Sequence, residues 1–364
     1  MSTTSIQSRR DLFEHLEYTI EGTYEELVDD QELQSGQTML KTFLIESNVT
    51  PEQLRERVNI AEAREVDFDL HELVIRRNGN KHTFFLDSSD SRFWTLYTLE
   101  ESDDAKAVVK DMVSGVRNGL DYTWMPVEQQ RDVMNMGEFR DVGVSYEADE
   151  VFSSDYIDDR LDFGDLSVQS SGRGTSTLFD ILDNQEELSS FLSLSSVGIK
   201  REIGGSFVLE RVTHNGRFTT SGGDSIQLHI DTVDEIKNRY ADLLQRIEEH
   251  HRISYESKEH GTGIGGTPLV IELDNEIEDV REFIENVITA KNPLRLWGAK
   301  TKLDEQYWKV KGIDLHNNDK YTMEICPEWI RLYLDEEACG NTALRIYANL
   351  QRHYDSNAVM EVLE

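Results

Sequence analysis

Three segments of this chain share one predicted order of elements, and that order limits the fold more than any other feature of the sequence. Each segment runs strand, Asn-containing turn, strand, third strand and amphipathic helix. Asn and Gly adopt the left-handed backbone conformation of a two-residue hairpin turn at little cost, so each turn predicts a β-hairpin. The three turns are Asn78-Gly79, Asn215-Gly216 and Asn317-Asn318.

The elements around these turns follow from the apolar pattern. The hairpin strands are predicted over residues 69–76 and 82–86, 207–212 and 217–220, and 308–315 and 321–326. The third strands are predicted over 93–99, 225–230 and 329–334, and the helices over 102–116, 232–250 and 341–354. Apolar residues at spacings of three and four support the helices. The shared order is compatible with duplicated modules and also with chance, because this arrangement is common in α+β proteins.

The N-terminal region is predicted to be helical. Helices are expected from about Asp11 and over residues 36–46. Thr50-Pro51-Glu52-Gln53 begins another helix, with Thr as the N-cap, Pro at the first helical position and Gln three residues after the cap. The predicted fold class is therefore α+β, with an N-terminal helical segment, then hairpin–strand–helix modules, and a C-terminal antiparallel sheet with flanking helices.

Shifts in composition divide the chain into six parts. Two of them are rich in Gly, one also in Asp and Ser, which is typical of linkers. The predicted parts are a helical N-terminal segment (1–65), a first α/β module (66–141), an acidic Ser/Gly-rich linker or excursion (142–177), a second α/β module (178–259), a Gly-rich linker (260–267) and a C-terminal α+β domain (268–364).

The charge balance of the chain indicates the character of its surface. The chain carries 71 Asp and Glu against 37 Lys and Arg, a net charge of −34 that is spread along the sequence. Such self-repulsion opposes folding in dilute buffer, whereas molar salt shortens the Debye length to about 3 Å. The composition resembles that of cytoplasmic proteins of haloarchaea that accumulate salt, so we expect K⁺ and hydrated salt ions at the surface. The alternatives are an acidic protein from a low-salt organism and an acidic mimic of nucleic acid.

The sequence also indicates a cytoplasmic protein. Its two cysteines, Cys326 and Cys339, form no CxxC motif, and this usage is expected in a reducing cytosol. No apolar run approaches the length of about 18 residues that a membrane span requires, and the first ten residues contain no apolar stretch typical of a signal peptide. We therefore expect no membrane partner.

Three motifs suggest chemistry, but each has a simpler interpretation. The run from Gly261 to Gly266 matches the dinucleotide-binding pattern, but a strand is predicted to follow it where a helix is required, which favours an interdomain connection. Glu256-Ser-Lys258 with Asp231 is similar to the motif of metal-dependent nucleases, but a helix replaces the required hairpin. His250 and His251 project about 100° apart on a helix, which favours a solvated helix end over a metal site. We predict no catalytic residue, metal or cofactor.

A group of cations near the C-terminus is the clearest local departure from the acidic composition. Residues 291–320 hold six of the thirteen lysines, interleaved with Trp297 and Trp308. Lys309 and Lys311 alternate along a predicted strand, so both are expected on one face of it. We predict an anion-binding or nucleic-acid-binding strip; the alternative is a sheet face that neutralises neighbouring carboxylates. This cationic strip comprises Lys300, Lys302, Lys309, Lys311 and Arg331.

These observations favour a non-catalytic binding or adaptor protein of a halophile, acting through sheet surfaces on a protein or nucleic-acid partner. The inference depends on the lack of catalytic motifs that converge on one reaction. Two alternatives remain from the sequence. One is a metal-dependent hydrolase or nuclease with dispersed carboxylates, and the other is the acidic mimic of nucleic acid.

Overall fold

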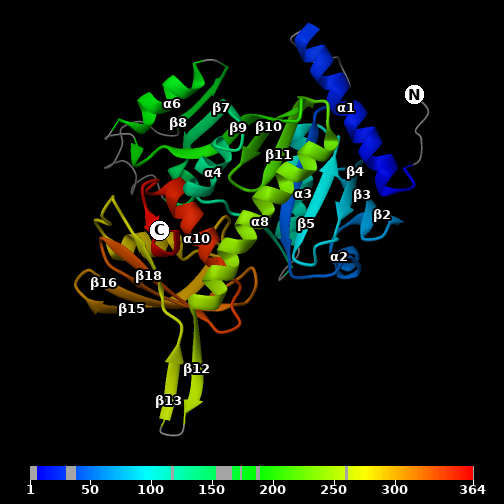
Figure 1. Cartoon of the computed structure of the whole chain (residues 1–364). Helices are drawn as coiled ribbons and strands as arrows, with labels where there is room; N and C mark the ends of the chain where they lie inside the picture. The colour runs from blue at the N-terminus through cyan, green and yellow to red at the C-terminus, as the bar shows by residue number, and fades with distance from the viewer. Residues whose placement is uncertain are drawn as a thin grey trace. The chain divides into compact units, whose positions relative to one another are not determined.

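The computed structural model describes residues 6–29, 38–115, 119–152, 166–172, 174–185, 189–258 and 261–363. This part of the chain forms eight α-helices and nineteen strands in antiparallel and mixed sheets, with a helix at its N-terminal end (Figure 1). The predicted α+β class is therefore confirmed. Residues 153–165 and 173 of the predicted acidic linker lie outside the described residues. The predicted six-part division itself stays a prediction.

The chain forms two compact units. Unit 1 comprises Met1–Thr123, Asp132–Arg140 and Val197–Asn238, and unit 2 comprises Trp124–Arg131, Asp141–Ser196 and Arg239–Glu364. Four of the five boundaries fall inside elements, which are α4 (Val127–Met134), β7 (Glu138–Tyr146), β9 (Ser193–Ile203) and α8 (Ile226–His250).

Unit 1 is built on a sheet in which seven strands follow the order β2-β3-β4-β5-β1-β11-β10, with β6 paired to β1. Hydrophobic clusters cover both faces of this sheet. One cluster joins it to α1 and to the first turns of α8, and the other joins it to α3. The elements are α1 (Arg9–Asp29), β1 (Leu40–Ser47), α2 (Pro51–Arg57), β2 (Ile60–Asp67), β3 (Leu70–Arg77), β4 (Asn80–Asp87), β5 (Phe93–Thr98), α3 (Ser102–Gly115), β6 (Leu120–Tyr122), β10 (Ser206–Thr213) and β11 (Arg217–Gly223).

Local capping and turn signals in unit 1 behave as the sequence predicts. Thr50 caps α2 through a complete capping box, in which the Gln53 backbone N–H donates to Thr50 Oγ1 and the Thr50 backbone N–H donates to Gln53 Oε1. The hairpin of β3 and β4 turns at Asn78 and Gly79, which have φ angles of 50° and 85°. These left-handed conformations are the ones that Asn and Gly adopt at low cost.

Two element predictions in unit 1 are wrong. Residues 36 and 37 of the helix predicted over 36–46 lie outside the described residues, and from Leu40 onward the segment is strand β1, which lies between β5 and β11 and has all eight residues buried. Continuous burial on both faces removes the alternation that identifies a strand in a sequence. The strand predicted over 225–230 is the start of α8, where the Leu228 backbone N–H donates to the Ser225 hydroxyl at 3.2 Å.

Unit 2 is built on a sheet that runs in the order β13-β12-β18-β17-β16-β15, with β14 also paired to β18 and to β19. The predicted C-terminal meander is present as β15 to β18. The segment predicted as a Gly-rich linker is, over Gly261–Gly265, strand β13 of a hairpin with β12 (Figure 1). The further elements are η1 (Ala148–Glu150), β8 (Leu166–Ser171), α6 (Thr175–Asp183), β12 (Arg252–Lys258), β14 (Leu269–Glu272), α9 (Val280–Val287), β15 (Leu296–Asp304), β16 (Tyr307–Asp314), β17 (Lys320–Ile325), β18 (Trp329–Asp335), α10 (Asn341–His353), β19 (Val359–Met360) and η2 (Glu361–Leu363).

Helix α10 is buried along its whole length, and a buried ion pair joins it to the sheet. The Arg345 guanidinium lies 2.5 Å from Asp314 Oδ1, and both side chains are at most 1% exposed. Thr342 Oγ1 and the His316 backbone N–H also donate to this carboxylate, at 2.7 and 2.8 Å. Burial acts to raise the pKa of Asp314, but Arg345 and these hydrogen bonds outweigh it and lower the pKa.

We expect Arg345→Met to lower the free energy of unfolding of the protein by about 3–5 kcal/mol, because it leaves a buried carboxylate without its charged partner. Chemical denaturation measures this change. Arg281→Met is the control, since the Arg281 side chain is 66% exposed and forms an i,i+4 pair with Glu285, a type of pair that contributes roughly 0.5 kcal/mol. Equal losses in the two variants would contradict the assigned role of Arg345.

Burial makes His353, at the end of α10, a source of acid sensitivity. The pKa of His353 is lowered to about 4, chiefly by burial and also by Arg352, while the backbone and charge of Glu147 act in the opposite direction. Since this pKa lies below the value of about 6.5 for an exposed histidine, the unfolded chain binds more protons between these pH values. The contribution of His353 to stability is therefore complete above the pKa of histidine in the unfolded chain, and it decreases as pH falls below that value.

We expect His353 to contribute a loss of about 3 kcal/mol in the free energy of unfolding as pH falls from about 6.5 to about 4. Denaturant titrations across this range measure the loss. His353→Gln is expected to remove this part of the pH dependence, whatever it does to stability at neutral pH. An unchanged slope in the variant would show that other groups carry the acid sensitivity.

Candidate functional site

One face of the β15–β18 sheet in unit 2 carries alternating aromatic and cationic side chains. Cross-strand partners share a face of an antiparallel sheet, so the register defines this set. We call it the outer face; it comprises Val270, Glu272, Trp297, Ala299, Thr301, Asp304, Tyr307, Lys309, Lys311, Ile313, Lys320, Thr322, Glu324, Trp329, Arg331, Tyr333 and Asp335.

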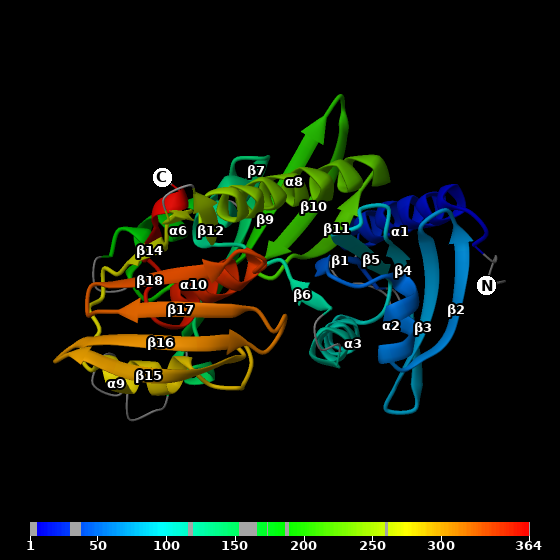
Figure 2. The ribbon, with the colours of Figure 1, turned by 90° about the horizontal axis from the view of Figure 1, so that it is seen from below.

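The outer face is open because the helices of unit 2 lie behind the sheet. Figure 2 looks onto this face, with α9 and α10 on the far side of the strands. Side chains that point the other way, such as Met323 and Ile325, are fully buried. On the outer face, by contrast, Trp297 is 58% exposed, and Lys311 is exposed as well. The sheet therefore presents one packed side and one side that is available to a ligand.

Aromatic rings and cations lie against each other on the outer face. The rings of Tyr307 and Trp329 meet edge to face, with centroids 5.9 Å apart. The Arg331 guanidinium lies 4.6 Å from the centre of the Trp329 ring, and Lys309 Nζ lies 6.0 Å from that of Tyr333. Such cation–π contacts hold the rings in fixed orientations while leaving part of each ring exposed.

Glu324 occupies the centre of this arrangement. Its carboxylate lies 3.1 Å from Lys309 Nζ and 3.7 Å from the Arg331 guanidinium, and Tyr333 donates its hydroxyl hydrogen at 3.0 Å. Partial burial acts to raise the pKa of Glu324, but the hydrogen bonds from Lys309 and the tyrosines lower it. Two of the cations therefore neutralise a carboxylate of the same sheet, as the alternative interpretation of the sequence predicts for this face.

The structure divides the predicted cationic strip between the two sides of the sheet. Lys309, Lys311 and Arg331 lie together on the outer face. Lys300 and Lys302 point to the opposite side of β15, where Lys300 pairs with Glu285 of α9 and Lys302 lies 6.0 Å from the ring of Trp308. The division follows from the two-residue period of strands. Whether these residues bind an anion stays a prediction.

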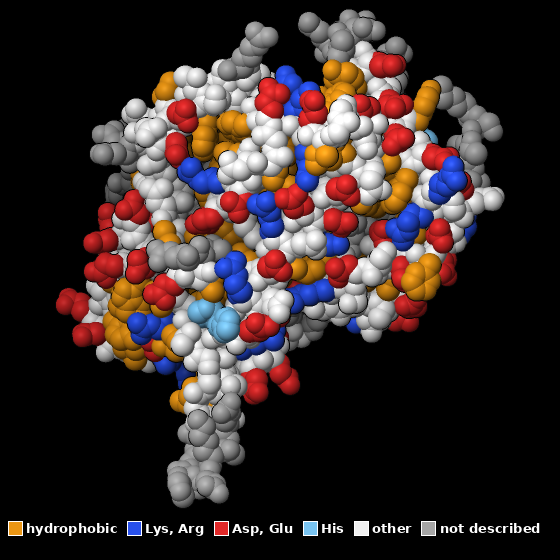
Figure 3. All heavy atoms as spheres, viewed as in Figure 1, with side chains coloured by type: hydrophobic (Ala, Val, Ile, Leu, Met, Phe, Trp, Pro, Cys, Tyr) orange, Lys and Arg blue, Asp and Glu red, His pale blue; other side chains and the backbone are white. Residues whose placement is uncertain are grey.

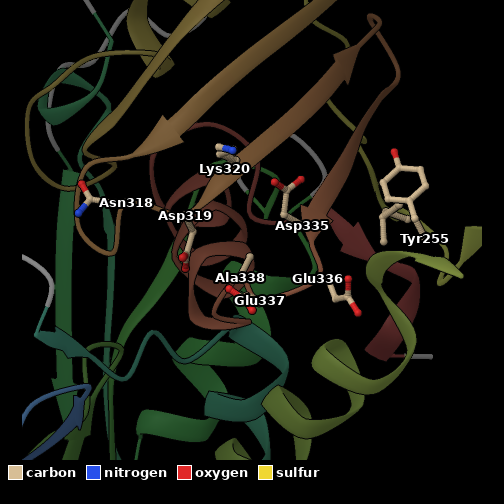
Figure 4. Close-up of a pocket in the computed structure, with 9 residues that line it drawn as sticks. Tyr255, Asn318, Asp319, Lys320, Asp335, Glu336, Glu337 and Ala338 are labelled. Atoms are coloured by element: carbon tan, nitrogen blue, oxygen red, sulfur yellow. The ribbon is translucent and has the colours of Figure 1, made fainter.

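A pocket of about 400 Å³ adjoins one end of the outer face. Figure 4 shows its acidic side chains gathered around one hollow. Burial raises the pKa of Asp319, although the Cys339 backbone N–H, which donates to it at 2.8 Å, acts in the opposite direction. With four carboxylates against one lysine, this pocket disfavours anions. Its lining comprises Ile253, Tyr255, Asn318, Asp319, Lys320, Asp335, Glu336, Glu337 and Ala338.

The remaining candidates of the sequence form no site in the described part of the chain. The described residues contain no group of three or more His, Cys, Asp or Glu arranged to hold a metal ion. The side chains of Glu256 and Lys258 lie outside the described residues. His251 contacts the backbone oxygen of Thr267 at 3.2 Å, so it packs at the end of α8. The run from Gly261 to Gly266 contains strand β13, with no helix directly after it.

Unit 1 contains one buried cluster of polar side chains that the sequence did not predict. His229 of α8 contacts Glu210 Oε1 at 2.7 Å and Thr42 Oγ1 at 2.9 Å, and Thr220 lies within 3.3 Å of the imidazole. All four side chains are at most 2% exposed. A solvent-borne substrate does not reach them, so we assign this network to the packing of α8 on the sheet.

Sequence comparison places the chain in a family. The protein has an α+β fold with a ligand-accessible sheet face, and no helix in the described residues has both the length and the apolar character of a membrane span. Residues 1–364 match the family described as MJECL33-like protein, and the chain belongs to this family. It is similar to "Uncharacterized protein MJECL33" of the archaeon Methanocaldococcus jannaschii, with 29% identity over 394 residues that cover 98% of this chain and 94% of the relative.

Proposed function

We propose that this protein binds single-stranded nucleic acid on the outer face of the β15–β18 sheet. The observation that supports the proposal is the set of aromatic rings on this face, with the exposed Trp297 at one edge and the half-buried Trp329 and Tyr333 further across the sheet, beside cations. Bases stack on aromatic side chains irrespective of sequence, and cations beside the rings attract the phosphates. A flat sheet provides several stacking positions for one extended strand.

The charge of the outer face favours a polyanion over a basic partner. The face carries four cations and four carboxylates, a net charge of zero, in a chain whose net charge is −34. Figure 3 shows acidic side chains scattered over the visible surface of the molecule. The acidic surface repels a polyanion, and the outer face repels it less because cations balance the carboxylates there. The four cations are Lys309, Lys311, Lys320 and Arg331, and the four carboxylates are Glu272, Asp304, Glu324 and Asp335.

The acidic surface supports a second part of the proposal, which is that the protein works in the cytoplasm of an archaeon that accumulates salt. Molar salt weakens phosphate contacts because it removes the gain from counterion release. Stacking on aromatic rings is much less sensitive to salt. A binding face in which rings contribute more than charge therefore fits a concentrated electrolyte.

We expect Trp297→Ala to weaken binding of an oligothymidylate by about 5- to 150-fold, which corresponds to about 1–3 kcal/mol for one stacked base. Lys311→Glu is expected to weaken binding and to reduce its salt dependence. Fluorescence anisotropy of the labelled oligonucleotide, titrated with protein in KCl, measures both effects. Oligothymidylate is suitable because it forms no stable secondary structure.

Lys302→Glu is the matched control for this experiment, because it makes the same charge change on the same hairpin but on the opposite side of the sheet. Its affinity for the oligonucleotide is expected to equal that of the unmodified protein. If the unmodified protein does not bind the oligonucleotide, or if Lys302→Glu weakens binding as much as Lys311→Glu, the outer face is not a nucleic-acid site. A protein partner would then be the better interpretation.

We expect the free energy of unfolding to rise between about 0.1 M and about 1 M KCl, because the Debye length shortens from about 10 Å to about 3 Å and screens the carboxylates from one another. Circular dichroism during chemical denaturation with urea, which is uncharged, measures the change. Sorbitol at equal osmolality is the control for effects other than screening. Full stability and a single monomeric species without added salt would contradict adaptation to high salt.

A further inference from the structure

A second cluster of cations lies in unit 1, on the face of the sheet that α3 covers. In the strand register, Lys41 of β1 is opposite Thr98 of β5 and Thr219 of β11, and Thr219 is opposite Arg211 of β10. These four residues form one row across four strands. Arg217 lies on the same side of β11, two residues before Thr219.

Lys41 is much more buried than is usual for a charged side chain, and Arg217 is buried in part. Lys41 is only 4% exposed, and its Nζ donates to the backbone oxygen of Glu100 at 2.6 Å. The Nε atom of Arg217 is buried and makes no hydrogen bond to any described residue. Within the described residues, neither side chain forms an ion pair, although the chain contains 71 carboxylates. Buried charges are ordinarily paired.

The positive charges in this cluster repel one another. Arg217 acts on Lys41, and Arg211 acts on Arg217. Burial lowers the pKa of Lys41 to about 8, Glu101 and Glu100 oppose this change, and Arg217 adds to it. Burial also lowers the pKa of Arg217, and Arg211 adds to this effect, against Asp103 and Tyr122. The carboxylates at the start of α3 therefore compensate the cations only in part.

We propose that Lys41, Arg211, Arg217 and Thr219 form a binding site for a phosphate-type oxyanion. Guanidinium, ammonium and hydroxyl groups are the donors that phosphate oxygens accept in proteins, and such charge-assisted bonds are short and strong. A bound dianion supplies the negative charge with which neither Lys41 nor Arg217 is paired among the described residues. Arg211, Arg217 and Thr219 are half-buried, so the site has a side that is open to solvent.

The test is isothermal titration of the full chain with inorganic phosphate at constant KCl. We expect saturable binding. The affinity is expected to be about ten-fold lower in Arg217→Gln and in Arg211→Gln, because each variant loses about one charge-assisted hydrogen bond to the phosphate. Arg64→Gln is the matched control, because Arg64 pairs with Glu72 between β2 and β3, away from this row, and its affinity is expected to be unchanged. Without phosphate, Arg217→Gln is expected to be at least as stable as the unmodified protein.

The pH dependence of the unmodified protein provides a readout that needs no variant. Affinity for phosphate is expected to fall as pH rises above about 8, where Lys41 loses its proton. A titration with a phosphate monoester distinguishes a free ion from an esterified phosphate. The affinity for oligothymidylate is expected to be the same in Arg217→Gln as in the unmodified protein, because we propose that the oligonucleotide binds the outer face of unit 2. Binding of the free ion alone, or of free ion and monoester, supports the site. Binding of the oligonucleotide alone, no phosphate binding, or equal affinities in all three arginine variants would overturn it.

Discussion

The buried ion pair between Arg345 and Asp314 fixes which side of the unit 2 sheet can meet a ligand. It joins the centre of α10 to the end of β16, and Thr342 and the backbone of His316 complete the hydrogen bonding of the carboxylate. Charges of this kind tolerate almost no displacement, because an uncompensated charge in a buried site is costly. With α10 held on one side, the aromatic and cationic residues of β15 to β18 remain on the other.

Local signals in the sequence predict those parts of the fold that depend on neighbouring residues. The capping box at Thr50 and the turn at Asn78 and Gly79 act over four residues or fewer, and both are present. Strand β1 depends on β5 and β11, which lie far from it in the sequence, and its continuous burial resembles that of a core helix. Residues 225–230 show the reverse error, since a Ser cap and tertiary packing make them helical.

The same distinction between local signals and long-range contacts applies to the candidate site. Lys309 and Lys311 share a face because they lie two residues apart on one strand, which the sequence shows directly. The position of Arg331 beside Glu324 depends on the pairing of β17 with β18 across the connection at residues 326–328, which alternation along one strand does not show. Lys300 and Lys302 could not be assigned, because the exposed, polar end of β15 lacks the apolar alternation that identifies a strand.

The turn at Asn317 and Asn318 therefore determines more than a change of direction. Asn318 has a φ angle of 62°, and its conformation sets which residue of β17 meets each residue of β16. A slip of one position would turn Glu324 toward α10 and Met323 toward solvent, since neighbouring residues of a strand face opposite ways. The chemical identity of this surface is thus encoded in the number of residues in one short loop as much as in the side chains themselves.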